Sequence, residues 1–401
     1  MVRLALALTV VSLSAAACTT NGGRPTATPT TVAVLGQHAG TTVALGQPAP
    51  TGTGELGAVS CADAQHCWAV GVAASTAGGT TTTPPPVTVI AATADGGLHW
   101  AAQRLTLAVT PDLTGVSCPT LGRCMAVGST GSNPPTGTVL TTRNGGRTWT
   151  AAGTPAGALA VIGVVCTTST NCTVLVSDGT TLWSDTSLNF GTGWTQKGNL
   201  PAGLQDARDL SCTLSGTCLV VGNTPTTTGH GQGAVVISVD AGSTWAAAAV
   251  PTGTGLLQSA ACASATRCLA VGTTSTTVSG VVPAAGALLL SDDGGHTWTP
   301  SPATPPVNNI FGVDCPLVKV CVMVGTRWVG GTAVGTGAVA RSTDGGTTFI
   351  RSTTAYTPLT LTAVACPTDT TCLAVGGDTV ARLTLPTIVT APAPPHHGAT
   401  R

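Results

Sequence analysis

Cysteine spacing is the feature of this sequence that most constrains its fold. Fourteen of the fifteen cysteines form seven pairs with one spacing, Cys-x5-Cys, and successive pairs begin 46 to 57 residues apart. A fixed period of this length is typical of a repeat architecture, in which each repeat is one supersecondary unit. The pairs are Cys61/Cys67, Cys118/Cys124, Cys166/Cys172, Cys212/Cys218, Cys262/Cys268, Cys315/Cys321 and Cys366/Cys372.

Each repeat has the pattern of four short strands. In the second repeat, runs rich in β-branched residues at 114–118, 124–128, 138–142 and 148–153 are separated by Gly, Pro, Asn and Ser. Such runs predict strands, and no sustained 3.6-residue period after the N-terminal segment predicts a helix. Seven four-stranded units therefore predict an all-β fold, a seven-bladed β-propeller with one disulfide per blade.

The N-terminus indicates export. A basic start, an apolar run over 4–13 and small residues before Cys18 form a secretory signal, because ten apolar residues are too few to span a bilayer. The segment resembles a bacterial lipoprotein signal, which implies an acylated Cys18, although Ala15 stands where that motif usually has Leu. We expect a cell-membrane protein, lipid-anchored on the extracytoplasmic side, with plain secretion as the alternative.

Export also bears on the cysteine pairs. Regularly spaced pairs in an exported chain predict a disulfide framework. Zinc would need four ligands per site, and the chain has only seven histidines, so we expect no metal site and no cofactor. The expected organisation is a signal peptide at 1–17, a Thr/Pro-rich tether at 18–30, the propeller at 31–385 and a disordered tail at 386–401.

Between the third and fourth strands of six repeats lies a recurring turn, for example "SDDGGHTW" at 291–298. It resembles the Asp box, Ser/Thr-x-Asp-x-Gly-x-Thr-Trp, of the BNR-repeat propellers, which include sialidases, other glycoside hydrolases and non-enzymatic binding proteins. The resemblance implies that the acidic or amide residue is structural and accepts hydrogen bonds from turn amides. These residues are Asp95, Asn144, Asn189, Asp240, Asp293 and Asp344.

The same turn predicts how the ring closes. The aromatic residue that ends it precedes the next first cysteine by 17 or 18 residues, and counting 18 back from Cys61 gives Val43. We therefore expect the N-terminus to supply the outer strand of the last blade, which removes an open sheet edge. Either 379–384 or 31–36 could be the third strand of that blade.

Comparison of the repeats with one another gives candidate binding residues. Arg208 and Asp209 break a small, neutral pattern just before the first cysteine of the fourth repeat, and Asp314 breaks it in the sixth. A buried charge must be paired or functional, so we weigh two interpretations: an Arg208–Asp209 or inter-blade ion pair, which we favour, and a ligand site. Arg327, Trp328 and Tyr356 are further candidates. We expect all six residues at the top face of the ring, opposite the cysteine turns and the Asp-box turns, and we expect the ligand to bind there.

Composition limits the function. Charged residues make up 7% of the chain and the net charge is zero, so we expect no nucleic-acid partner and membrane contact only through the lipid anchor. We expect a monomeric, non-catalytic binding or assembly module for a protein or glycan of the cell envelope. The chain also resembles, more distantly, the photosystem II assembly-factor lipoproteins.

A glycoside hydrolase is the alternative. A sialidase-like mechanism would use Tyr356 and Glu55, which fall in neighbouring linkers, but Arg208, Arg327 and Arg351 form no convincing arginine triad.

Overall fold

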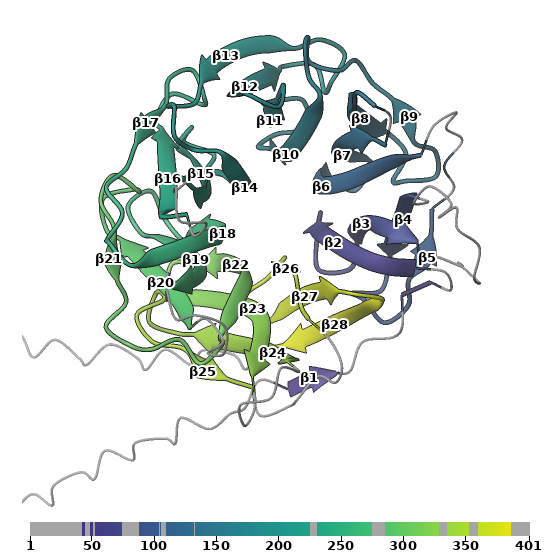
Figure 1. Cartoon of the computed structure of the whole chain (residues 1–401). Coiled ribbons are helices and arrows are strands. Elements are labelled where there is room, and N and C mark those ends of the chain that lie inside the picture. Colours follow the sequence, from purple (N-terminus) through teal and green to yellow (C-terminus); the bar gives the residue numbers. More distant parts are fainter. Residues whose placement is uncertain are drawn as a thin grey trace, which may run out of the picture. The chain divides into compact units, whose positions relative to one another are not determined.

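The protein is built from β-strands. The computed structural model describes residues 42–44, 49–50, 53–73, 88–103, 105, 110–131, 133–224, 231–274, 285–328, 335–352 and 360–385. The described residues belong to one compact unit and contain 28 strands and no helix. The strands form seven antiparallel four-stranded sheets arranged as blades around a central axis (Figure 1). The predicted seven-bladed propeller is confirmed.

The inner half of every blade is made by strands A and B, where A lies next to the axis. The A strands are β2 (Thr53–Cys61), β6 (Pro111–Thr120), β10 (Ala160–Cys166), β14 (Asp206–Cys212), β18 (Thr254–Cys262), β22 (Asn309–Leu317) and β26 (Ala363–Ala365). The B strands are β3 (Cys67–Ala73), β7 (Arg123–Thr130), β11 (Cys172–Ser177), β15 (Cys218–Asn223), β19 (Cys268–Thr274), β23 (Val320–Trp328) and β27 (Thr371–Gly376).

The outer half is made by strands C and D. The C strands are β4 (Thr88–Thr93), β8 (Gly137–Thr142), β12 (Leu182–Ser187), β16 (Gly233–Ser238), β20 (Gly286–Ser291), β24 (Gly335–Ser342) and β28 (Thr379–Thr384). The D strands are β5 (Ala101–Ala102), β9 (Thr150–Ala151), β13 (Thr195–Asn199), β17 (Ala246–Ala247), β21 (Thr299–Pro300), β25 (Ile350–Arg351) and β1 (Thr42–Ala44). Most D strands are shorter than the sequence predicts.

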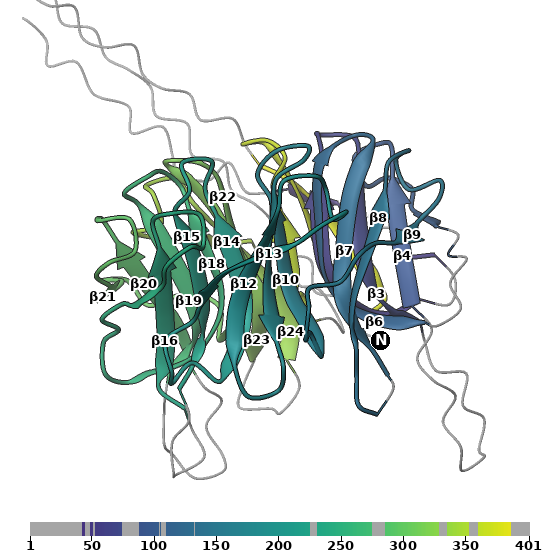
Figure 2. The same cartoon turned by 90° about the horizontal axis from the view of Figure 1, so that it is seen from above.

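All seven predicted disulfides form, each within its own Cys-x5-Cys. In blade 1, Cys67 pairs with Cys61 on one side and with Thr93, the last residue of β4, on the other. The A–B hairpin turns and the C–D turns therefore meet at one face of the ring, which we call the disulfide face. The strands run from this face to the opposite one (Figure 2). The bridges are Cys61–Cys67, Cys118–Cys124, Cys166–Cys172, Cys212–Cys218, Cys262–Cys268, Cys315–Cys321 and Cys366–Cys372.

In blade 6 the A–B hairpin extends beyond the disulfide, which the sequence did not predict. The second repeat predicts a strand B that begins at the second cysteine, but β23 begins one residue earlier, and Cys321 is fully buried within the strand. The hairpin continues past the bridge because Leu317 pairs with Val320 across a tight turn. A register shift between Asp314 and Leu317 accompanies this pairing, so Cys315 and Cys321 are bonded beside a bulge and are not directly opposed in the ladder. Blade 2 has the same shift around its own bridge, so its strands also extend beyond the predicted bounds.

A glycine recurs in strand B where strand A bulges. In blade 2 the register shifts between Leu113 and Gly115, and Gly128 lies opposite this shift. A Cβ at Gly128 would overlap the backbone oxygen of Asp112, and the equivalent glycines of five other blades show the same overlap with strand A. The close backbone approach that the sequence predicted explains these glycines.

The C–D turns share one hydrogen-bond pattern. In blade 5, Ser291 Oγ donates to Asp293 Oδ1 (2.8 Å) and accepts from Gly295 N–H, and Asp293 Oδ1 accepts from Thr297 N–H (2.9 Å). Hydrogen bonds from Thr297 hold the pKa of Asp293 below its ordinary value. Asn144 makes the equivalent contact with Thr148 N–H at 3.0 Å, so the turn needs the side-chain oxygen but not its charge.

The core consists of seven clusters, one between each pair of neighbouring blades. The cluster between blades 1 and 2 contains Trp68, Val70, Leu113 and the fully buried Trp149. The aromatic residue that ends each of the six C–D turns contacts such a cluster: Trp100, Trp149, Trp194, Trp245, Trp298 and Phe349. Burial of these rings stabilises the packing of neighbouring blades against each other.

The ring is closed by the N-terminal strand. β1 pairs antiparallel with β28, with Val43 opposite Leu383, so the predicted strand donation is confirmed. The open question about strand C of the last blade is also answered, because β28 occupies that place between β1 and β27. Residues 31–36 lie outside the described residues.

Candidate functional site

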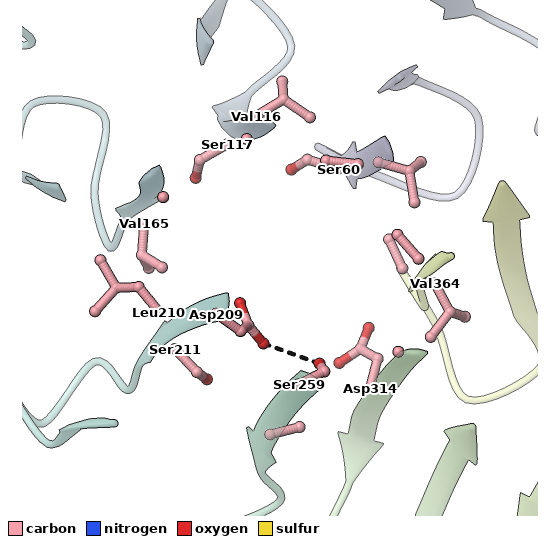
Figure 3. Close-up of a pocket in the computed structure, with 18 of the residues that line it drawn as sticks. Ser60, Val116, Ser117, Val165, Asp209, Leu210, Ser211, Ser259, Asp314 and Val364 are labelled. Carbon is pink, nitrogen blue, oxygen red and sulfur yellow. Dashed lines mark hydrogen bonds between the residues drawn. The ribbon is translucent and has the colours of Figure 1, made fainter. Parts of the chain in front are cut away.

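The candidate site is the central channel. The seven A strands line a cavity of about 430 Å³, to which each blade contributes the four residues before its first cysteine. Most of these residues are small or apolar, such as Gly115, Val116 and Ala363, while Ser60, Ser117 and Ser259 supply hydroxyl groups. Figure 3 shows the side chains converging from all sides on this space.

One wall of the channel carries two carboxyl groups. Asp209 on β14 and Asp314 on β22 lie on either side of Ser259 from β18 (Figure 3). Ser259 Oγ donates to Asp209 Oδ2 at 2.9 Å, and Ala260 N–H donates to the same oxygen at 3.0 Å. These bonds tie blade 4 to blade 5.

Asp314 ties blade 6 to blade 7 in a similar way. Its Oδ2 accepts from Cys366 N–H at 2.6 Å, and its Oδ1 accepts from Cys315 N–H at 2.7 Å. In blades 1 and 2 a serine takes this role, since Ser60 Oγ accepts from Cys118 N–H and Ser117 Oγ from Cys166 N–H. The two carboxyls thus accept backbone N–H groups of the next blade, as serine hydroxyls do at other blade junctions. Unlike the serines, they also add ionisable groups to this wall of the channel.

Asp209 and Asp314 are half-buried in the channel, and loss of solvation there makes ionisation of both carboxyls costly. Desolvation raises the pKa of Asp314 to about 6, and the nearby Asp209 carboxylate adds to the rise. Desolvation also raises the pKa of Asp209, against the opposing effect of the hydrogen bonds from Ala260 and Ser259. Neither carboxyl forms an ion pair with a cation in the described part of the chain. A ligand that brings hydrogen-bond donors or positive charge would offset the cost of desolvating these two carboxyls.

Arg208 lies at the edge of the same cavity but pairs differently from the alternative considered in the sequence. Its Nη2 contacts Asp206 Oδ2 at 2.5 Å, and both side chains are exposed. The expected Arg208–Asp209 pair is wrong because the strand bulges at Arg208 and the two neighbouring side chains project differently: Asp209 faces the channel and Ser259. An exposed pair of this kind contributes little to stability.

The other candidate residues that the structure describes lie outside the channel. Arg327 and Trp328 end β23 on the face opposite the disulfides, where Trp328 N–H donates to Asn308 Oδ1 at 3.0 Å. Glu55 is exposed on β2, and Tyr356 lies outside the described residues. Arg351 has a lowered pKa, caused first by burial and then by the neighbouring Arg327. Among the candidates with a described position, only Arg208, Asp209 and Asp314 share one cavity.

The structure also shows a carboxyl that sequence reasoning missed. Asp185 on β12 is 3% exposed, and its Oδ1 has no hydrogen-bond partner among the described residues. Burial raises its pKa, and a contact with Trp183 only partly offsets this. The available signal was an acidic residue inside a strand C, where the other blades have none. It lies away from the channel.

The described residues contain no group of three His, Cys, Asp or Glu side chains arranged to hold a metal ion. Within the same residues, no helix is long and apolar enough to cross a bilayer.

Comparison with known proteins shows the fold alone. No protein-family model matches the chain, and no curated protein matches it. Among solved structures, YCF48 bound to a D1 peptide aligns with a TM-score of 0.61 at 15% identity, covering 85% of this chain and 96% of that one. YCF48 from Cyanidioschyzon merolae gives 0.57 at 14% identity, covering 85% and 99%. The GH74 xyloglucanase from Xanthomonas campestris gives 0.55 at 15% identity, covering 85% of this chain and 53% of the enzyme. The chain therefore shares its propeller fold with both non-enzymatic proteins and glycoside hydrolases.

Proposed function

We propose that this protein is a non-catalytic binding or assembly module, lipid-anchored through Cys18 on the extracytoplasmic side of the cell membrane. Its ligand, a segment of a protein or glycan of the cell envelope, binds in the central channel beside Arg208, Asp209 and Asp314. One observation carries the binding site: two desolvated carboxyls lie on one wall of one cavity, and no described cation pairs with them.

The chemistry of the channel indicates the kind of ligand. Asp209 and Asp314 offer acceptors on one side, whereas the apolar Val116 and the hydroxyl of Ser117, which can donate or accept, lie across the channel (Figure 3). A volume of about 430 Å³ is within the range of small-molecule sites, and it also suits a chain end or one protruding loop of a partner. A protonated amine or a group rich in N–H donors would therefore bind more favourably than an anion.

The comparisons support a binding role only at the level of the fold. One YCF48 structure carries a D1 peptide, so a ring of this form can bind a peptide. The proposal for this chain rests on its own channel, because identity to that protein is 15%.

Glycoside hydrolysis is the second candidate, and one observation favours it. Asp209 and Asp314 share a cavity and have raised pKa values, as a general acid does in carbohydrate hydrolysis. Against it, both carboxyls are already engaged by backbone amides of the neighbouring blade.

Binding is tested with the mature protein on peptide and glycan arrays, followed by calorimetry on each hit. Asp209→Asn and Asp314→Asn keep the side-chain oxygen for the blade junction, and we expect each to weaken binding about tenfold or more. Asp185→Asn is the matched control, because it removes a buried carboxyl far from the channel. Equal binding by all variants would place the ligand elsewhere, and glycan hydrolysis that disappears with Asp314→Asn would establish the hydrolase instead.

The anchor has its own test. Intact-mass analysis of the mature protein should show loss of residues 1–17 and the added mass of acyl chains, and Cys18→Ser should release the protein from the membrane fraction. An unmodified mature chain would favour plain secretion and leave the channel proposal intact.

A further inference from the structure

The disulfide face carries the exposed large apolar side chains of the described residues. Eight such side chains are at least 45% exposed: six lie in A–B or C–D turns, Leu317 ends β22 next to an A–B turn, and Ile350 begins β25 after a C–D turn. The most exposed are Leu214 (85%), Leu188 (73%) and Val239 (60%). Large apolar side chains that are exposed to solvent indicate an interaction surface when they cluster on one side of a molecule.

Four of these side chains lie on three consecutive blades. Leu121 is in the A–B turn of blade 2, Leu188 in the C–D turn of blade 3, and Leu214 and Val239 in the two turns of blade 4. We call this part of the face the blade 2–4 sector. Its apolar residues stand at turn tips, and neither the channel cavity nor the groove beside β16 includes any of them. Apolar side chains that project from separate turns can contact a broad, flat partner, whereas a single inserted segment would need a groove.

The blade 2 and 3 part of this sector is positively charged, whereas blade 4 contributes Asp240 next to Val239. Arg123 begins β7, and Arg143 and Arg147 lie in the C–D turn of blade 2; none of the three forms an ion pair in the described part of the chain. The guanidinium carbons of Arg123 and Arg143 lie 5.3 and 5.1 Å from the centroid of the buried Phe190 ring in blade 3. This stacking holds two cations next to each other at the surface.

Acidic residues are missing from the turns where the arginines lie. The A–B and C–D turns of blades 2 and 3 contain no Asp or Glu, whereas the corresponding turns of each other blade contain at least one, such as Asp95 or Asp344. Asn144 and Asn189 replace the turn aspartates there and still accept the turn amides. The fold therefore does not require the missing negative charge, and its absence leaves the arginines uncompensated.

The chain also enters the ring at this face. Thr42, the first residue of β1, pairs with Thr384, and Thr384 pairs with Thr371 next to the Cys372 disulfide. Any segment that links the ring to Cys18 therefore joins it on the side that carries the exposed leucines.

We propose that the blade 2–4 sector is a membrane-docking surface for anionic phospholipid. Leu121, Leu188, Leu214 and Val239 insert at the headgroup boundary, while Arg143 and Arg147 pair with lipid phosphates, as amphipathic interfacial segments do. The proposal adds a protein–lipid contact to the proposed anchor. It orients the ring so that the face opposite the disulfides points away from the bilayer.

The test uses the full mature chain with Cys18→Ser, so that docking is measured without an anchor and its failure stays separate from failure of the anchor proposal. The probe is flotation with vesicles of phosphatidylcholine, with and without phosphatidylglycerol. We expect salt-sensitive binding to the anionic vesicles only. Binding should fall about tenfold or more in Leu188→Asp/Leu214→Asp and in Arg143→Glu/Arg147→Glu. The matched control Leu317→Asp/Val318→Asp changes exposed residues on blade 6 and should bind like the parent.

Three results would overturn the proposal: no binding to anionic vesicles at low salt, equal losses in the blade 6 control, or a stable dimer that the Leu188→Asp/Leu214→Asp variant converts to monomer. The last result would make the sector an interface between two copies of the chain. Because the substituted leucines are exposed, unchanged circular dichroism and melting should accompany every variant.

Discussion

Removing the Asp314 carboxyl should change how the stability of the ring depends on pH. The pKa of this group rises from 3.8 to about 6 on folding, because it is desolvated on the channel wall next to Asp209. The folded state therefore binds the proton more tightly than the unfolded state. The resulting stabilisation is fully present below about pH 4 and is lost as the pH rises through about 6. At 1.36 kcal/mol per pH unit, the two values correspond to about 3 kcal/mol.

Asp314→Asn keeps an oxygen for Cys366 N–H but cannot ionise. The free energy of unfolding of this variant, relative to the parent, should therefore rise by about 3 kcal/mol between pH 4 and pH 7. Urea unfolding with intact disulfides, repeated across this range, measures the difference. The reasoning fails if the difference between variant and parent stays constant with pH.

Asp293→Asn provides a control of opposite sign. Hydrogen bonds from Thr297 lower the pKa of Asp293, so its contribution is present above its ordinary pKa and is lost as the pH falls. Relative to the parent, this variant should gain stability toward acid, whereas Asp314→Asn should gain it toward neutral pH. A shared trend would indicate that net charge, and not the channel environment, causes the effect.

Three further predictions follow from the packing. Gly128→Ala should destabilise the ring by about 1–3 kcal/mol in urea unfolding, because its Cβ would meet strand A backbone, whereas Gly57→Ala, with open space around it, should change stability by less than about 0.5 kcal/mol. Replacing both Cys118 and Cys124 with Ala should cost about 2 kcal/mol and leave the ring folded; loss of the native circular dichroism spectrum would contradict this. Deleting residues 31–50 removes β1 and should expose the edge of β28, so size-exclusion chromatography should show aggregation, and a monomer with unchanged melting would refute the closure argument.

The fold was predictable because its signals are local and repeated. The Cys-x5-Cys pairs and the C–D turns mark the same two positions in nearly every blade, so spacing alone located β1 near Val43. The assignment of 379–384 to strand C stayed open because the last blade lacks the turn that marks the end of that strand elsewhere. The extra ladder pair beyond Cys321 was not predictable from spacing, because the distance between the two cysteines is the same in every blade.

The site was only partly predictable, because its contacts join distant repeats. Comparison of the repeats identified Asp209 and Asp314 as unusual, but their partners Ser259 and Cys366 are about 50 residues away in the next blade. Pairing of Arg208 with Asp206 depends on a bulge that no local pattern shows. The exposure of Leu214 was not predictable either, because a leucine in a short turn looks the same in sequence as a core leucine.

Closure by β1 has a consequence for the order in which the protein folds. Val43 and its partner Leu383 stand 340 residues apart, whereas blades 1 to 6 each consist of contiguous sequence with a local disulfide. Bringing the ends of a flexible chain of that length together would cost about 5 kcal/mol of loop entropy. That cost largely disappears once six blades have stacked and already hold the ends near each other. A chain that becomes available from its N-terminus onward can therefore complete blades 1 to 6 one by one, but the ring stays open until its last strands arrive.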